Sequence, residues 1–452
     1  MSTRSRKNCS HDVLQLKPSA YAEKTGYERP SIDQRSDATL ETLPSDAPST
    51  LAHRRRVDAG RSETFPAPLV LPNDELAIDP DYEPQSLRSW VCEEERNKPS
   101  MKRKTLYVAA VPEISSDVGF MRNWLQPRLK TSARSSTTWK LTAPPLEGFI
   151  EYLNAFYYGM SVKAAPSLRF ISWDKPEDAP ASKKPSKNIK HVGLVVGDDC
   201  TRIRARPSPD GIFEGQLNLE DILDCAIELL PKDAYAMILL VDHDLYEDDE
   251  DDFCCGRAYG GSRVAVVSIA RYHPILDDYF EIDFTHVWPA SHCKAYVDGI
   301  CAVDLQVEDE TSRAAETAGP LRVAFNAVKD LKKPTTKKER EDLRFSRVAK
   351  TVVHELGHCF GMDHCVYYAC IMQGTANMAE DLRQPPYLCP VCLSKISLAI
   401  ACEATGLREE SDIAKYERKR YRALADFCDS RREVGMFAGY GAWLNQRLEY
   451  LP

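Results

Sequence analysis

The sequence predicts an α/β fold in which a mixed, twisted sheet packs on long helices. Apolar runs at residues 190–198, 234–242 and 262–272 predict buried strands. A helical pattern at residues 217–231 separates the first two runs, which indicates a βαβ unit and a partly parallel sheet. A long helix is predicted over residues 336–360, because a charged first half passes into an apolar second half.

The rest of the chain lies on either side of this pattern. Residues 1–100 are rich in Ser, Pro, Arg, Asp and Glu, and we expect a mostly disordered N-terminal extension because such a composition buries little apolar surface. The apolar segment 65–80 is an exception that can pack as an extended arm. We therefore expect one ordered domain over residues 101–405, followed by a charged helical C-terminal tail over residues 406–452.

Three shorter segments have distinct patterns within these regions. Residues 148–160 and 393–404 show helical periodicity, and the heavily charged segment 410–434 predicts a helix at the surface. The acidic run at residues 247–252 lacks the ligand spacing and the internal glycine of a calcium-binding loop. We expect a solvated surface loop there.

Composition limits the classes of function. The chain has 452 residues, of which 43% are hydrophobic, and a net charge of -9, so a general nucleic-acid-binding surface is not expected. The first residues lack the apolar core of a secretory signal, and the apolar runs are too short to span a bilayer. We expect a monomer in the cytoplasm or nucleus with no nucleic-acid or membrane partner. The fifteen cysteines are then expected to stay reduced.

The strongest functional signal is the segment "HELGHCFGMDHC". His354 and His358 are four residues apart, so on a helix they share one face and can ligate one metal ion. Gly361 can adopt the left-handed conformation that ends a helix, which lets His364 return to the same metal. Glu355 can contact a metal-bound water without being a ligand. Two helix histidines with separate partners would account for His354 and His358 alone, but not for the added glycine and third histidine.

Four cysteines, of which the first is the last residue of this segment, occur at regular spacing. Cys365 and Cys370 have four residues between them, and Cys389 and Cys392 have two. Four thiolates complete the tetrahedral coordination of zinc and leave no open position, which is typical of a structural site. Disulfides are the next possibility, and a buried free thiol would account for any one of these cysteines alone. Cys359 is expected only to pack.

With these motifs the sequence resembles the archaemetzincins, a family of zinc metallopeptidases. The resemblance spans roughly residues 190–395 and rests on HExxHxxGxxH, on the two cysteine pairs and on Met372 between them. It implies a metzincin-like zincin domain, in which Met372 is the Met-turn methionine beneath the catalytic zinc and Met378 is a weaker candidate for that role. It also implies an antiparallel edge strand that pairs with an extended substrate, formed by Arg263, Val264, Ala265, Val266, Val267 and Ser268.

The resemblance further implies a zinc-dependent hydrolase of peptide bonds that acts on a peptide or protein. Two Zn2+ ions per chain are expected, one catalytic ion on the three histidines and one structural ion on the four cysteines, with Glu355 as the general base. Two alternatives stay open: a catalytically weak, zinc-stabilised protein-binding module derived from a peptidase, and a zinc hydrolase of non-peptide amides. The remaining lone histidines are expected to be structural or to lie on the surface: His243, His286 and His292.

Overall fold

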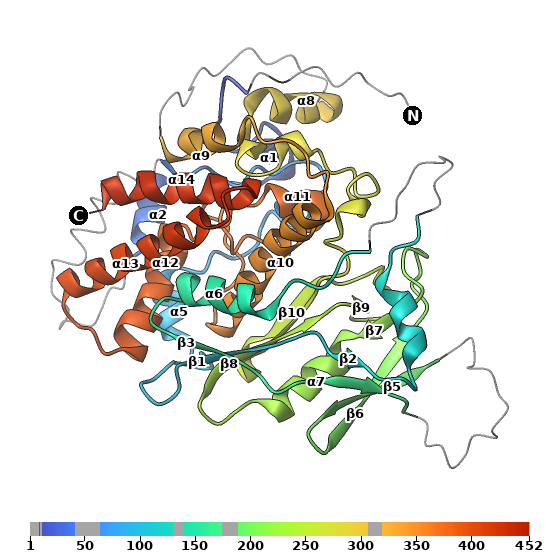
Figure 1. Ribbon diagram of the computed structural model, residues 1–452. Helices are drawn as coiled ribbons and strands as arrows, with labels where there is room; N and C mark the ends of the chain where they lie inside the picture. The colour runs from blue at the N-terminus through green and yellow to red at the C-terminus, as the bar shows by residue number, and fades with distance from the viewer. Residues whose placement is uncertain are drawn as a thin grey trace.

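The computed structural model describes residues 9, 11–40, 64–129, 140–173, 189–305 and 319–451. Two sheets and a set of helices form a mixed α/β fold (Figure 1), which confirms the predicted fold class. Within the described residues no helix has both the length and the apolarity that a membrane span requires.

The central sheet has five strands in the order β10–β11–β8–β1–β3. Their bounds are β10 (Gly256–Tyr259), β11 (Val264–Ser268), β8 (Ala234–Val241), β1 (Thr105–Ala109) and β3 (Ser161–Ala164). Neighbouring strands from β3 to β11 are parallel, and β10 is antiparallel to β11. Strands β8 and β11 are buried along their whole length, so the strands predicted at residues 234–242 and 262–272 are confirmed.

A second sheet has six strands in the order β2–β4–β5–β6–β7–β9. Their bounds are β2 (Glu113–Ile114), β4 (Arg169–Ile171), β5 (His191–Val196), β6 (Asp199–Arg206), β7 (Gln216–Asn218) and β9 (Asp244–Tyr246). Strand β5 belongs to this sheet and is antiparallel to both neighbours, so the predicted βαβ unit is wrong. A continuous apolar run indicates burial of both faces of a strand, but it does not identify the strand with which it pairs.

The predicted edge strand also requires correction. Strand β11, with residues 264–268, lies between β10 and β8 and is parallel to β8, while Arg263 is in the preceding turn with φ 62°. The antiparallel edge is β10. Strand β11 is covered by helices on both faces and is therefore wholly apolar, whereas the edge strand "GRAY" is short and half-exposed. The apolar run in the sequence therefore corresponds to a buried inner strand and not to the edge.

Helices cover both faces of the central sheet. Helix α10 (Lys337–Cys359) packs with α6 (Leu146–Phe156) on one face, and α7 (Leu219–Leu229) packs on the other. All three helices were predicted. Thr336 forms a capping box with Glu339 at the start of α10, and Asn218 caps α7 by accepting a hydrogen bond from the backbone N–H of Asp221. The long, well-capped α10 provides a rigid support for its last two turns.

The C-terminal helices join the same hydrophobic core. Helices α13 (Glu410–Asp429) and α14 (Gly435–Tyr450) pack on each other, and α13 also packs on α6. Tyr421 and Leu424 of α13 and Trp443 of α14 are buried, so only one face of the charged helix is exposed. Helix α12 (Pro390–Ser397) continues as a π-helix over Leu398–Ala404. The domain boundaries at residues 101 and 406 stay predictions.

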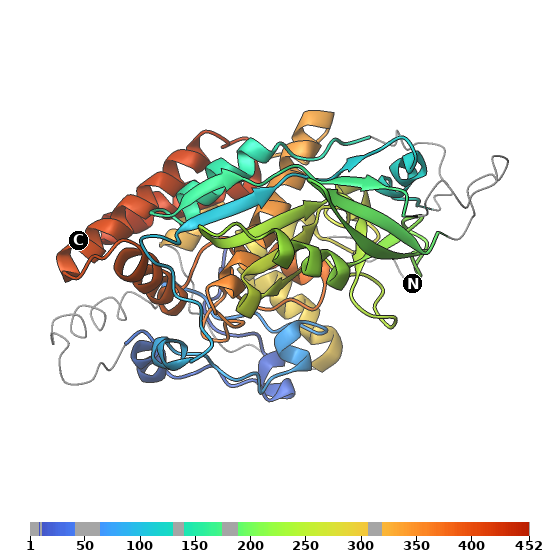
Figure 2. The ribbon, with the colours of Figure 1, turned by 90° about the horizontal axis from the view of Figure 1, so that it is seen from below.

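The described parts of the N-terminal extension are ordered against the domain, which differs from the expectation based on composition. They contain α1 (Tyr21–Thr25), α2 (Ile32–Asp37), α4 (Glu75–Ile78) and α5 (Leu87–Cys92). Helix α1 lies beside α8 (Lys294–Leu305) in Figures 1 and 2, α5 packs on α12, and α9 (Pro320–Val328) packs on α14. Leu14 and Trp90 are fully buried. The few apolar residues of the extension bury against an existing domain and need no core of their own. Residues 41–63 lie outside the described residues.

Candidate metal centre and active site

Two of the three predicted histidines lie on the last two turns of α10. Nδ1 of His354 is 2.7 Å from the carbonyl oxygen of Ile371, and Nδ1 of His358 is 2.6 Å from that of Met362. A carbonyl oxygen can only accept, so each Nδ1 carries a proton and each Nε2 has a free lone pair. The two Nε2 atoms are 3.0 Å apart, as expected for ligands that face one point.

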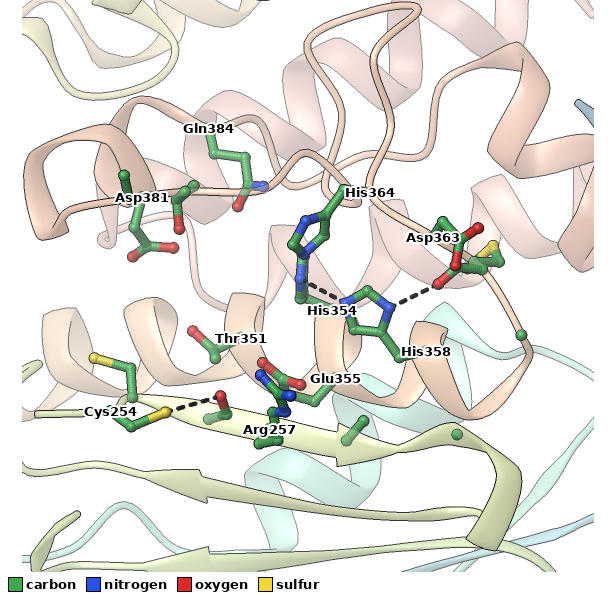
Figure 3. Close-up of a pocket in the computed structure, with 18 of the residues that line it drawn as sticks. Cys254, Arg257, Thr351, His354, Glu355, His358, Asp363, His364, Asp381 and Gln384 are labelled. Carbon is green, nitrogen blue, oxygen red and sulfur yellow. Dashed lines mark hydrogen bonds between the residues drawn. The ribbon is translucent and has the colours of Figure 1, made fainter. Parts of the chain in front are cut away.

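The chain turns back after α10 and brings His364 to the same point. Gly361 has φ 76°, which confirms the predicted left-handed helix end. The ligand atoms of all three histidines lie within 4.8 Å of one another (Figure 3). Burial lowers the pKa of His364 to about 4, so that its imidazole is neutral. Three converging neutral imidazoles fit zinc and leave one coordination position open.

The Glu355 side chain lies beside the three histidines and against the edge strand. It is 7% exposed, and burial raises the pKa of its carboxyl to about 8, although the positive charge of Arg257 opposes that rise. A cation on the histidines would oppose it further. A Cβ atom at Gly256 would lie 3.0 Å from Oε1 of Glu355. The missing side chain at Gly256 therefore allows the carboxylate to approach strand β10.

A cleft of about 850 Å³ opens over this group. It is lined by β10, by the end of α10 and by residues 361–364 and 375–378. The carbonyl of Cys255 accepts a hydrogen bond from the backbone N–H of Ser268 and so points toward β11. Because backbone direction alternates along a strand, the N–H and C=O groups of Gly256 and Ala258 point to the free edge at the cleft.

The four predicted zinc-ligating cysteines come together in a buried cluster. Their sulfur atoms lie within 4.8 Å of one another, and each residue is at most 4% exposed. Sγ of Cys370 accepts hydrogen bonds from the backbone N–H groups of Met372 (3.5 Å) and Cys389 (3.3 Å), as expected for a thiolate. The described cysteines are all free, which disfavours the disulfide alternative. Four such sulfurs fit a closed tetrahedral zinc site.

The two methionines have different positions. Met372 is fully buried, and a Cβ atom at Gly357 of α10 would lie 2.4 Å from its Sδ. Its thioether therefore packs directly beneath the turn that carries His358. Met378 lies instead at the start of α11 (Met378–Arg383), where it lines the cleft and its Sδ is 3.5 Å from Sγ of Cys255. Of the two, Met372 has the placement expected of a Met-turn methionine.

Two of the lone histidines have structural surroundings. His243 is fully buried between aromatic side chains and lies 3.1 Å from the carboxylate of Asp242. His292 is 1% exposed, and its Nε2 is 3.0 Å from the carbonyl oxygen of Ala67. His286 differs, because it lies beside two cysteines and a second histidine. The acidic run is exposed at residues 248–250, as expected of a solvated loop.

Sequence reasoning missed the residues that border the site from elsewhere in the chain. Arg257 and Gly256 face Glu355 from strand β10, and the ring of Tyr82 in the extension is 5.7 Å from that of His364. No local motif marks these positions. Only the turn residues after "GRAY" could have indicated the hairpin that brings β10 to the cleft.

Residues 319–398 match the model of peptidase family M54. Archaemetzincin-2 of Macaca fascicularis is 24% identical over 411 residues, with 88% of this chain and 87% of that protein covered. Archaemetzincin-2 of Homo sapiens is 22% identical with the same coverage. The crystal structure of archaemetzincin from Methanopyrus kandleri has a TM-score of 0.31 and 16% identity, over 67% of this chain and 98% of that one.

The chain is similar to the archaemetzincins, as the resemblance of its motifs predicted. This similarity supports a zinc metallopeptidase.

Proposed function

We propose that the protein is a zinc-dependent metallopeptidase of the metzincin type that hydrolyses peptide bonds in peptides or proteins. The observation that carries the proposal is the convergence of His354, His358 and His364 on one point beside the buried Glu355, at the base of a cleft with a free strand edge. Zinc bound there would polarise the scissile carbonyl and lower the pKa of a water molecule.

The chain's own residues have separable roles in this proposal. Glu355 accepts a proton from the attacking water and delivers it to the leaving amine. The outward-facing N–H groups of Gly256 and Ala258 and the carbonyl of Ala258 pair with the backbone of an extended substrate, while the carbonyl of Gly256 accepts a hydrogen bond from the thiol of Cys254 (3.3 Å). The guanidinium of Arg257 compensates the negative charge of Glu355 and of Glu247, whose Oε1 lies 3.2 Å from its Nε. The proposed substrate-binding edge is therefore β10, and not residues 263–268 as expected from the sequence.

The cysteine cluster is proposed to hold a second, structural zinc ion, because its four thiols leave no position for water or substrate. With the histidine site, this gives two zinc ions for the peptidase. The thiols of the cluster persist in a reducing compartment, so we propose that the protein acts in the cytoplasm or nucleus. A monomer stays our expectation for its oligomeric state.

Peptide cleavage provides the direct test of this function. We expect the full chain to cleave members of a mixed peptide library, and cleavage to stop when a zinc chelator is added and return when zinc is restored. Mass spectrometry of the products gives the cleaved bonds. Glu355→Gln, tested in parallel, separates this activity from that of a contaminating peptidase. Full zinc content without any cleavage would contradict the proposal and favour the binding-module alternative.

Gly256 offers a test of the contact between Glu355 and the edge strand. In Gly256→Ala the new Cβ would lie 3.0 Å from Oε1 and 3.2 Å from Cδ of Glu355, so the carboxylate must shift. We expect turnover to fall by about tenfold, since small misplacements of a catalytic group are costly, with zinc content unchanged. Gly261→Ala is the matched control, because a Cβ there would meet no atom within 4 Å. Equal activity of both variants would show that Glu355 does not act from this position.

A further inference from the structure

A second group of cysteines and histidines lies outside the peptidase site, between the N-terminal extension and the domain. It consists of Cys9 and His11 from the extension and of His286 and Cys293 from the segment before α8. The four ligand atoms lie within 4.8 Å of one another, and the two sulfur atoms are 3.2 Å apart. The arrangement therefore brings two thiols and two imidazoles to one point.

Hydrogen bonds orient both imidazoles toward that point. Nδ1 of His286 is 2.9 Å from a carboxylate oxygen of Asp283, and its buried Nε2 has no nitrogen or oxygen partner among the described residues but faces the two sulfur atoms. Nε2 of His11 is 3.2 Å from the carbonyl oxygen of Thr285, so Nδ1 is its ligand atom toward the cluster, and the backbone of Cys9 also hydrogen-bonds to this ring. The ring of Tyr296 stacks on His286 at 4.0 Å. At metal sites, the ring nitrogen of a histidine ligand that does not bind the metal commonly donates a hydrogen bond to a carboxylate.

The backbone around the cluster is fixed as well. Arg322 donates a hydrogen bond to the carbonyl of His11 (2.9 Å), and the N–H of Gln15 donates one to the carbonyl of His292 (2.9 Å). Figure 2 shows the blue N-terminal segment alongside the yellow helix α8. The ligands are therefore held in place by contacts that do not involve the cluster itself.

We propose that Cys9, His11, His286 and Cys293 form a further zinc site. Two thiolates and two imidazoles are a tetrahedral ligand set that zinc prefers, and four protein ligands leave no open position, so the site is structural. A disulfide between the two cysteines would not explain why both histidines converge on the sulfur atoms. It would also leave Nε2 of His286 without a partner. The proposal does not depend on peptidase activity.

The site has a structural consequence for the peptidase domain. It fastens the start of the extension, and later residues of that extension cover the loop that carries the zinc-binding cysteines. Tyr27 donates a hydrogen bond from its hydroxyl to the carbonyl of Val366 (2.6 Å), and Arg29 donates one to the carbonyl of Tyr367 (3.2 Å). The zinc ion would thus stabilise the packing of the extension on this loop.

Metal content measured on matched variants tests the site. Cys9→Ser combined with His11→Ala should bind one zinc ion fewer per chain than wild type, whatever the wild-type total, because the ligands of the histidine site and of the four-cysteine site are untouched. The control combines Cys92→Ser with His191→Ala, which removes one exposed cysteine and one histidine outside every such cluster of the described chain, and it should keep the wild-type zinc content. An equal zinc content of the two double variants would overturn the proposal.

Three further measurements distinguish a zinc site from a disulfide and from simple packing of the four side chains. In protein loaded with Co2+, the difference spectrum between wild type and the Cys9/His11 double variant should contain a sulfur-to-cobalt charge-transfer band. Hydrogen exchange should become faster in residues 11–30 of that variant and stay unchanged in the control. Alkylation followed by mass spectrometry reports the state of the thiols: a Cys9–Cys293 disulfide in freshly purified protein would overturn the proposal.

Discussion

Replacing Glu355 by glutamine is expected to lower peptide turnover by about a hundredfold or more, the magnitude typical of a lost general base. The amide keeps the shape of the side chain and its contact with Gly256, but it cannot accept the proton of the attacking water. The three histidine ligands are unchanged, so the zinc content should equal that of wild type. Turnover of purified protein and elemental analysis of the same sample measure both quantities.

A matched control makes this result specific. Glu94→Gln makes the same chemical change at an exposed position outside the cleft, and it should leave turnover at the wild-type level. Loss of zinc from Glu355→Gln would instead indicate that the carboxylate supports the metal site. Unchanged turnover would show that another group is the base or that the activity belongs to a contaminant.

The convergence of the proposed histidine and cysteine ligands could be predicted from sequence because their spacing is local. His354, His358 and Gly361 belong to one helix and its end, where 3.6 residues per turn and a left-handed glycine determine the geometry. His364 follows within three residues, so little of its position depends on distant parts of the chain. The cysteine pairs are similar, since each pair lies within one turn or one loop.

Strand pairing could not be predicted in the same way. The buried run 190–198 and the buried run 262–272 were identified as strands, but their neighbours were not, because β pairing depends on residues far apart in the chain. This is why β11 was expected at the edge, whereas β10 lies there. The same dependence on distant residues is why Gly256 and Arg257 were missed, although both face Glu355.

The N-terminal cluster shows the limit of composition as evidence. Cys9 and His11 have a single residue between them, and His286 and Cys293 have six, but 274 residues separate the two pairs. A segment poor in apolar residues was expected to be disordered, yet hydrogen bonds and a few buried side chains fasten residues 11–40 to the domain. The composition of a segment does not show whether another part of the chain offers a surface on which that segment can pack.

Cys389→Ser is expected to destabilise the protein by about 3 kcal/mol or more, because structural zinc contributes folding free energy that the unfolded chain cannot recover. The cluster joins the loop after α10 to the start of α12, where Cys389 is the N-cap residue. Removing one thiolate should release the ion and separate these segments. Thermal unfolding should therefore shift to a markedly lower temperature, with aggregation and one zinc ion fewer.

Two variants show whether this effect belongs to the zinc cluster. Cys428→Ser makes the same change at a fully buried cysteine of α13 outside the cluster, so it reports the cost of burying a hydroxyl, about 1–3 kcal/mol. His364→Ala removes a ligand of the open histidine site, and it should abolish activity with a smaller loss of stability, since α10 and the sheet stay packed. Thermal unfolding, zinc content and peptidase activity are measured on the same samples. If Cys389→Ser unfolds like wild type and keeps its zinc, the four cysteines are ordinary buried thiols and the proposed structural zinc ion on them is wrong.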